Sequence, residues 1–272
     1  MQRSHGEGLL TVKALAGRTR IDRLRQAGNA KIRVPKTHGD ALEAVLINTA
    51  GGITGGDTLD WTLAAGPGTR TVVTTQACER VYKSSEGVGV QTSTVRVGTE
   101  ASLFWLPQET ILFDRGRFRR TIDVTLDEGA RFVGLETLLL GREAMGETVS
   151  TGVFHDRWRI RRGDALIHAD DLRLDISPDR DFACPAALGG NRAVATLVAV
   201  LPDDAETLDL AVARARTLIG DGAGGASRIG EASKGKIVIR LAAPSGFALR
   251  QRLLPVLALF LDGQTLPKVW HL

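Results

Sequence analysis

The chain has 272 residues, a hydrophobic fraction of 43% and a net charge of +4, which is the composition of a soluble globular protein with a sizeable core. Its longest apolar runs, residues 193–201 and 253–261, are far shorter than the roughly 20 residues that a membrane-spanning helix needs. The first residues contain no apolar stretch typical of a secretory signal. We therefore expect a cytoplasmic protein that does not bind membranes.

The first distinctive segment is a glycine-rich stretch from Asn48 to Asp57, with two glycine pairs. Its spacing resembles the phosphate-binding loop GxxxxGK[ST], but Asp57 stands where the lysine is required and a strand pattern replaces the helix. A carboxylate at that point would repel a phosphate. We predict instead a tight turn, in which glycines adopt positive φ angles or admit another backbone, and in which Asp57 accepts amide hydrogens.

Strand patterns dominate the chain from about residue 8 to residue 200. Alternating and β-branched residues predict strands at 69–75, 88–97, 101–106, 121–126 and 167–174. Similar turns begin at Gly66, Gly98 and Asp127, which gives a weak repeat of about 30 residues. The repeat favours a mostly β, solenoid-like (β-helix-type) fold of stacked sheets over a plain sandwich, although periodicity alone does not separate the two.

Residues 154–162 carry a basic pattern within this β region. His155, Arg157, Arg159 and Arg161 are expected on one face of a strand, and the aromatic residues between them on the buried face. A nucleic-acid surface needs exposed aromatics among its charges. The pattern therefore favours an acidic protein partner and argues against nucleic-acid binding.

The C-terminal part, about residues 203–272, contains the predicted helices. Asp203 or Asp204 caps a helix that ends at Gly220, because apolar residues recur there at helical spacing. The sequence from Gly220 to Gly225 has GxGxxG spacing, but it follows a helix, so we interpret it as a helix terminus and loop rather than a dinucleotide site.

A strand is then predicted at 237–243, followed by a mostly apolar helix at 247–261 that Pro255 kinks or splits. A helix of this composition is expected to be buried, against the β body or in a partner's groove. No linker separates the β body from the helical part, so we predict a single domain over residues 1–272.

The residues provide no evident catalytic or metal centre. Cys78 and Cys184 are the only cysteines, and isolated thiols in a cytoplasmic protein are expected to be inert. The histidines do not have zinc-ligand spacing, and Ser84 and Ser85 have no histidine nearby in the sequence. We therefore predict that the protein is not an enzyme.

Five motifs in this order resemble the urease accessory proteins of the UreD (also called UreH) family over nearly the whole chain. They are residues 48–57, 74–84, 105–113 (Trp-Leu-Pro-Gln-Glu-Thr-Ile-Leu-Phe), 141–147 (Gly-Arg-Glu-Ala-Met-Gly-Glu) and 266–270 (Leu-Pro-Lys-Val-Trp). The positions that carry the resemblance include Asn48, Gly51, Gly52, Gly55, Gly56, Thr75, Gln76, Tyr82, Lys83, Pro107, Gln108 and Gly141. One departure is Cys78-Glu79, where smaller or basic residues are expected.

The resemblance implies a scaffold rather than an enzyme. Such a protein docks on apo-urease, binds a UreF-type accessory protein and through it recruits a UreG-type GTPase, so that nickel reaches the urease active site. It implies no tightly bound cofactor, but nickel in transit through a polar passage. The alternatives are an uncharacterised β-solenoid enzyme and a generic protein-interaction module.

Nickel in transit needs ligands that release it, and carboxylates suit this better than thiolates. The candidate nickel-passage residues are Asp57, Glu109, Glu136, Glu147, Asp170 and Asp171, with His155 and His168 as imidazole options. Each also has a structural interpretation; Glu136 and Glu147 are expected to pair with Arg142 as a buried ion pair. For partner binding we expect contacts from the C-terminal helix and terminus, namely Phe247, Leu253, Leu254 and Trp270.

Overall fold

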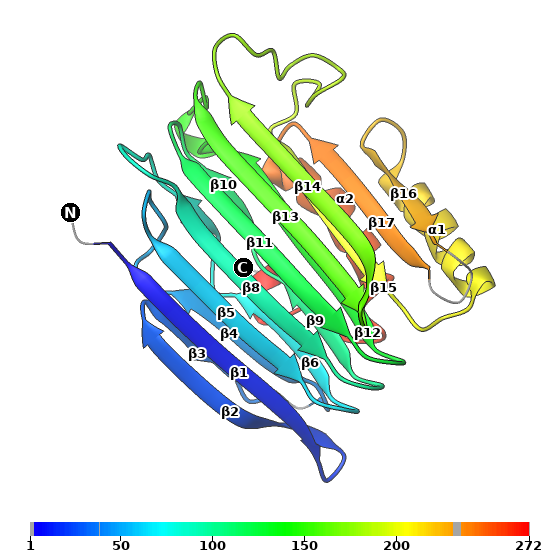
Figure 1. Ribbon diagram of the computed structural model, residues 1–272. Coiled ribbons are helices and arrows are strands. Elements are labelled where there is room, and N and C mark those ends of the chain that lie inside the picture. Colours follow the sequence, from blue (N-terminus) through cyan, green and yellow to red (C-terminus); the bar gives the residue numbers. More distant parts are fainter. Residues whose placement is uncertain (1–2, 38, 231–234, 272) are drawn as a thin grey trace.

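The computed structural model describes residues 3–37, 39–230 and 235–271, and consists mainly of two β-sheets that face each other (Figure 1). The seven-stranded sheet has the order β14-β13-β11-β8-β5-β1-β2. Its strands are β1 (His5–Leu15), β2 (Arg18–Gly28), β5 (Thr58–Ala65), β8 (Gly89–Val97), β11 (Arg117–Leu126), β13 (Gly152–Arg162) and β14 (Ala165–Ile176).

The ten-stranded sheet has the order β16-β17-β15-β12-β9-β6-β4-β3, with β7 and β10 paired beside β12. Its strands are β3 (Ala30–Arg33), β4 (Leu42–Asn48), β6 (Arg70–Thr75), β7 (Glu79–Val81), β9 (Ser102–Leu106), β10 (Thr110–Leu112), β12 (Arg131–Leu140), β15 (Ala193–Val200), β16 (Gly224–Ile229) and β17 (Lys236–Ala243). The helices are α1 (Ala205–Ile219) and α2 (Gly246–Ala258), with short 3-10 turns η1 (Glu143–Met145) and η2 (Lys268–His271).

The chain between β4 and β13 winds from one sheet to the other and forms a β-solenoid of about four turns. Successive strands pair in parallel, β5 with β8 and β11 with β13 in one sheet, and β6 with β9 and β9 with β12 in the other. The predicted repeat turns stack, since the amide of Ser102 donates to the carbonyl of Thr69 and that of Arg131 to Ala101, each at 2.8 Å. The mostly β, solenoid-like fold predicted from the repeat is therefore confirmed.

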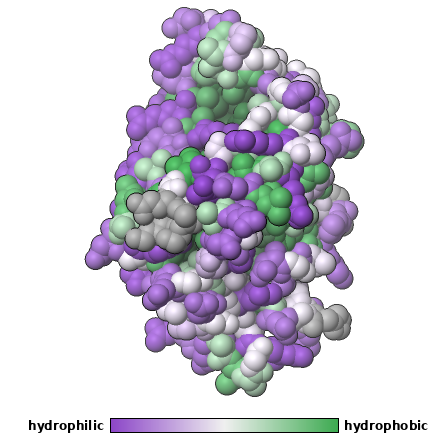
Figure 2. All heavy atoms as spheres, turned by 90° about the vertical axis from the view of Figure 1, so that its right-hand side faces the viewer, coloured by the Kyte–Doolittle hydropathy of each residue, from purple (hydrophilic) through white to green (hydrophobic). Residues whose placement is uncertain are grey.

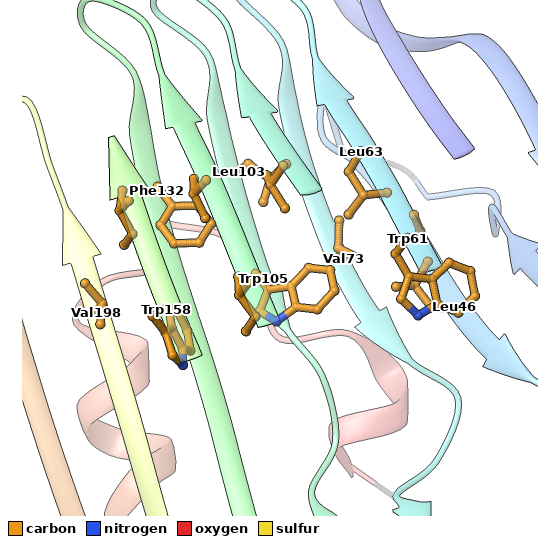
Figure 3. Packing of buried hydrophobic residues seen from close by; sticks show 14 of the residues in the cluster. Leu46, Trp61, Leu63, Val73, Leu103, Trp105, Phe132, Trp158 and Val198 are labelled. Carbon is orange, nitrogen blue, oxygen red and sulfur yellow. The ribbon is translucent and has the colours of Figure 1, made fainter. Parts of the chain in front are cut away.

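The space between the sheets is filled by large apolar side chains from both. Tryptophans lie along one level and smaller apolar residues and a phenylalanine along the next (Figure 3). The two rows are Trp61, Trp105 and Trp158, then Leu63, Leu103 and Phe132, and all six are at most 3% exposed. Alternation along each strand sends these residues inward, and burial at roughly 25 cal/mol per Å2 makes this ladder a main source of stability.

The C-terminal part continues the ten-stranded sheet, because β17 pairs with β15, and both helices cover the outer face of that sheet (Figure 1). Asp204 caps α1 by accepting the amide of Thr207 at 2.8 Å, and Ser245 caps α2 in the same way. The prediction of a loop that extends to Gly225 was wrong for Gly224 and Gly225. Residues 224–229 form the edge strand β16, whose pairing with β17 overrides its weak, glycine-containing strand pattern.

The helices also form part of the surface of the molecule. In the described part of the chain neither is long and apolar enough to cross a membrane. Some large apolar residues of this side are exposed, among them Leu210, Leu218 and Ile229. Figure 2, turned so that the side with α1 and β16 faces the viewer, shows such apolar patches interspersed with hydrophilic residues.

Candidate functional site

The five sequence motifs converge at one end of the solenoid, and residues 105–113 connect them. Thr75 accepts the amide of Gln108 at 2.9 Å, and β7 pairs in parallel with β10. Leu112 accepts the amide of Gly141, and Leu106 accepts the indole of Trp270. Motifs separated by up to 164 residues thus form one continuous structural unit.

The glycine-rich motif packs against the next one through its main chain. Ile53 bridges to Val81, and the Tyr82 hydroxyl donates to the carbonyl of Gly51. A Cβ at Gly52 would lie 2.6 Å from the carbonyl oxygen of Arg80, and one at Gly55 only 2.0 Å from that of Glu86. Gly52 also has a positive φ of 157°, so the close approach and special geometry predicted from the glycines are both confirmed.

Asp57 lies beneath this turn with its side chain only 8% exposed. Its two carboxylate oxygens accept the amides of Thr54 at 2.8 Å and Ser4 at 2.9 Å. The carboxylate therefore holds the turn and joins it to the start of β1, as the structural interpretation of this residue predicts.

A cavity of about 190 Å3 opens beside these motifs and extends between the two sheets. Its outer part is formed by Asn48, Gln76, Cys78 and Glu79, near the glycine turn. Its inner wall includes the side chains of Trp61, Trp105, Gln108, Thr110, Arg120 and Glu136. The cavity therefore leads from the family motifs at the surface to charged groups in the core.

The charged groups at the inner end are Arg120 from β11, Asp156 from β13 and Glu136 from β12. The guanidinium of Arg120 binds both oxygens of Asp156, at 2.9 and 2.8 Å, and also pairs with Glu136. We call this set the buried cluster; all three residues are at most 4% exposed. It holds two carboxylates and one guanidinium, so one negative charge is in excess when both acids are ionised.

Hydrogen bonds fix the geometry of the buried cluster. Trp105 donates its indole N–H to Glu136 at 2.8 Å, and Thr110 accepts from Arg120 at 3.0 Å. Burial raises the pKa of the Glu136 carboxyl, and the nearby charge of Arg120 opposes this. The same two carboxylates raise the pKa of Arg120, although burial alone would lower it. Arg120 therefore stays charged, while burial favours the protonated form of Glu136.

The mouth of the cavity carries a second acid, Glu79. Its carboxylate accepts the Asn48 amide at 3.0 Å, and removal from water raises its pKa to about 7. Cys78 beside it donates its thiol to Glu109 at 3.3 Å, and burial raises the pKa of that thiol to about 12. Cys78 is therefore a neutral thiol and not a reactive thiolate.

A separate ionic cluster attaches the C-terminus to the solenoid. Arg250 from α2 binds Glu109 at 2.6 and 3.2 Å and also reaches Gln108. The same guanidinium lies 5.1 Å from the ring of Trp270. We call this set the C-terminal clamp. Arg250 holds the Glu109 carboxylate in the C-terminal clamp. This carboxylate is therefore not free to bind an ion in the cavity.

The expected ion pair of Glu136 and Glu147 with Arg142 was only partly right. Arg142 does bind Glu147, at 2.9 and 3.0 Å, and this bond lowers the Glu147 pKa to about 2. The Arg142 side chain is 45% exposed, however, so the pair is not buried. Glu136 pairs with Arg120 instead, because inward alternation on β12 turns it into the core.

The remaining acidic and imidazole candidates lie away from the cavity, on β13 and β14. Asp171 binds His155 at 2.8 Å and Arg159 at 2.6 Å on the outer face of the sheet, and Asp170 pairs with Arg240 of β17. His168 is 7% exposed, and burial lowers its pKa to about 4. The structure thus separates these residues from Glu136 and Glu79.

Two of the four expected partner contacts are buried inside the chain. Leu253 and Trp270 are 1% and 2% exposed within the apolar cluster that joins the helices to the ten-stranded sheet, and Leu254 is partly buried there. As surface contacts Leu253 and Trp270 were wrong, because the helix uses its apolar face for its own core. Phe247 is 73% exposed and remains available.

The cluster partners Arg120 and Asp156 were missed by sequence reasoning, although a signal existed. Phe118 and Ile122 point inward on β11, so Arg120 between them must do the same. Asp156 lies between the inward Phe154 and Trp158 in the same way. Within residues 3–37, 39–230 and 235–271, no three histidine, cysteine or acidic side chains gather to hold a metal ion.

Comparison with known proteins identifies the family. The family model for the UreD urease accessory protein matches residues 4–271. The chain is 51% identical over 271 residues to the urease accessory protein UreD of Rhizobium johnstonii and to that of Rhizobium etli, covering 100% of this chain and 96% of each relative. Identity to the protein of the same name from Sinorhizobium medicae is 46% over 281 residues, with 97% of that relative covered. The chain belongs to the UreD family of urease accessory proteins.

Proposed function

We propose that this chain is a cytoplasmic scaffold for urease maturation and performs no chemical step itself. Its role in urease maturation follows from the family. The finer assignment is that it docks on apo-urease, binds a UreF-type protein, recruits a UreG-type GTPase through it, and gives nickel a polar route. The observation that carries the nickel route is the cavity that ends at the buried cluster with an excess carboxylate.

The chemistry of the cavity suits a cation in transit. Carboxylates at the mouth (Glu79) and at the inner wall (Glu136) attract a divalent ion. Two isolated acids do not make a closed coordination shell, so an ion would exchange readily. Arg120 limits the negative charge and thereby the residence time of the ion.

A partner surface for the UreF-type protein lies next to the cavity. A hollow of about 500 Å3 is bounded by η1 and the start of α2 and is lined by Tyr82, Phe113 and Met145. Met145 is 72% exposed, and the exposed Phe247 directly follows Gly246, the α2 residue that lines the hollow. Exposed large apolar residues around a hollow are typical of a protein-binding site.

Capture assays test this surface. Deleting residues 245–272 would remove core residues of the chain, so a point substitution is the better choice. Phe247→Asp should abolish capture of the UreF-type protein by the tagged chain, since a charge replaces an apolar contact. Leu210→Asp, at a 53% exposed position on α1, is the matched control and should capture normally. Normal capture by Phe247→Asp and by Met145→Asp, whose residue lines the hollow, would exclude this surface.

A further inference from the structure

The outer face of the seven-stranded sheet carries a basic surface on its β11–β13–β14 side. Residues alternate along each strand, so the inward aromatic side chains alternate with outward charged ones. On β11, β13 and β14 the outward positions contain six arginines against three aspartates: Arg117, Arg119, Arg157, Arg159, Arg161 and Arg173, with Asp123, Asp171 and Asp175. We call this surface the basic face.

Strand register concentrates the charge. Arg119 on β11 pairs with His155 on β13, which pairs with Arg173 on β14, so these three side chains form a row across the sheet. Within this row Arg173 donates to His155 at 3.3 Å, whereas Arg119 makes no side-chain hydrogen bond or salt bridge in the described part of the chain.

Internal salt bridges neutralise only part of the basic face. A single carboxylate, that of Asp171, binds both His155 and Arg159 and lies 3.7 Å from Arg173. Within the described part of the chain, Arg119 and Arg157 form no salt bridge and are exposed. A shallow hollow of about 550 Å3 is lined by these two arginines, by Arg117 and Arg173, and by one acidic residue, Asp175.

The residue types on the basic face indicate which class of anionic ligand it binds. The aromatic residues of these strands, Phe118, Phe154 and Trp158, are all buried. No ring of these strands is therefore available to stack on a base, which a single-stranded nucleic acid requires. Flat rows of guanidinium groups match carboxylates presented by a folded protein surface.

We propose that the basic face binds an acidic surface of a protein partner, and that this partner is apo-urease. The identity of the partner rests on the proposed function. A scaffold that joins two partners needs two separate surfaces, and the hollow lined by Tyr82, Phe113 and Met145 is built from the ten-stranded sheet, η1 and the start of α2. The basic face belongs to the other sheet, so both surfaces can be occupied at once (Figure 1).

Paired charge reversals test the proposal. In R119E/R157E and in the matched control R18E/R20E, two exposed arginines of the same sheet are replaced, so the net charge changes equally. Apo-urease and the UreF-type protein are then bound separately to each variant and to wild type, at about 50 and about 500 mM NaCl. We expect apo-urease affinity to fall at least about tenfold in R119E/R157E and to change less than about twofold in the control.

High salt should weaken wild-type binding of apo-urease, and binding of the UreF-type protein should be the same in all three proteins. Equal apo-urease affinity in the two double variants would overturn the proposal. A fluorescent poly-L-glutamate probe tests the chemistry of the face alone, and it should bind R119E/R157E most weakly.

If wild type captures no urease yet binds poly-glutamate through these arginines, the proposed function fails and the acidic-ligand face stands. If poly-glutamate binds all three proteins equally, the face proposal is wrong whatever urease does. Single-stranded RNA that binds through these arginines more tightly than poly-glutamate would replace the protein partner with nucleic acid.

Discussion

The buried cluster and the C-terminal clamp use the same residue types to different ends. Each combines an arginine, a glutamate and a tryptophan, and each joins distant parts of the chain. In the clamp, Arg250 faces one carboxylate, Glu109, and the guanidinium is partly open to solvent. In the buried cluster, Arg120 faces two carboxylates, and its side chain is only 3% exposed.

Charge balance distinguishes a structural ion pair from a candidate functional one. A balanced pair at the edge of a core needs no further partner. An excess carboxylate in the core needs a proton or a cation, because burying an uncompensated charge is strongly unfavourable. The adjoining cavity provides access for either one. Substitutions should therefore affect the two clusters differently.

The largest effect is expected from Arg120→Met. It leaves Asp156 and Glu136 buried without their cation, and breaking a buried ion pair from one side costs about 3–5 kcal/mol. The free energy of unfolding, measured by urea titration at pH 7.5, should fall by that amount. A loss below about 1 kcal/mol would show that the cluster is already neutral.

A smaller and more local effect is expected from Arg250→Met. It removes the partner of Glu109 and the contact with Trp270, for a loss of about 1–3 kcal/mol. Amide hydrogen exchange should increase in α2 and η2 but not in the solenoid strands. Arg252→Met, at an exposed position on the same helix, is the control and should leave exchange unchanged. Faster exchange throughout the solenoid would contradict a local clamp.

Glu79→Gln should have a small effect that depends on pH. The folded protein holds the Glu79 pKa at about 7, above its ordinary value of 4.5, so the fold favours the neutral acid. Wild type should therefore lose stability relative to the variant as the pH rises from about 5 to about 8. After solvent screening we expect a difference on the order of 1 kcal/mol at pH 8 and none at pH 5. Parallel thermal melts at both pH values measure it; a difference of the same size at pH 5 would exclude titration of Glu79.

Local patterns in the sequence predicted most of the fold. The alternating segments, the stacked turns and the capped helices all form where expected, because each depends on neighbouring residues. Strand β16 was missed because its pairing with β17, and not its own pattern, makes it a strand.

The site was less predictable because it depends on register between strands. Arg120 lies opposite Asp156 only once β11 and β13 are aligned, and Arg250 meets Glu109 across 141 residues. The alternation of inward and outward side chains along β11 and β13 would still have placed Arg120 and Asp156 in the core. The burial of these two residues was therefore predictable from the sequence. Burial of Trp270 was unpredictable from a short terminal segment whose contacts are all distant.

The most direct test of the nickel route is the nickel content of urease matured with Glu136→Gln. This change gives the buried cluster the balanced charge of the C-terminal clamp, and glutamine can still accept from Trp105, so stability should change by less than about 1 kcal/mol. Urease co-expressed with this variant and its accessory proteins should contain several-fold less nickel than urease matured with wild type or with the exposed control Glu206→Gln. Full nickel content with a folded Glu136→Gln protein would contradict the role of the buried cluster in nickel passage.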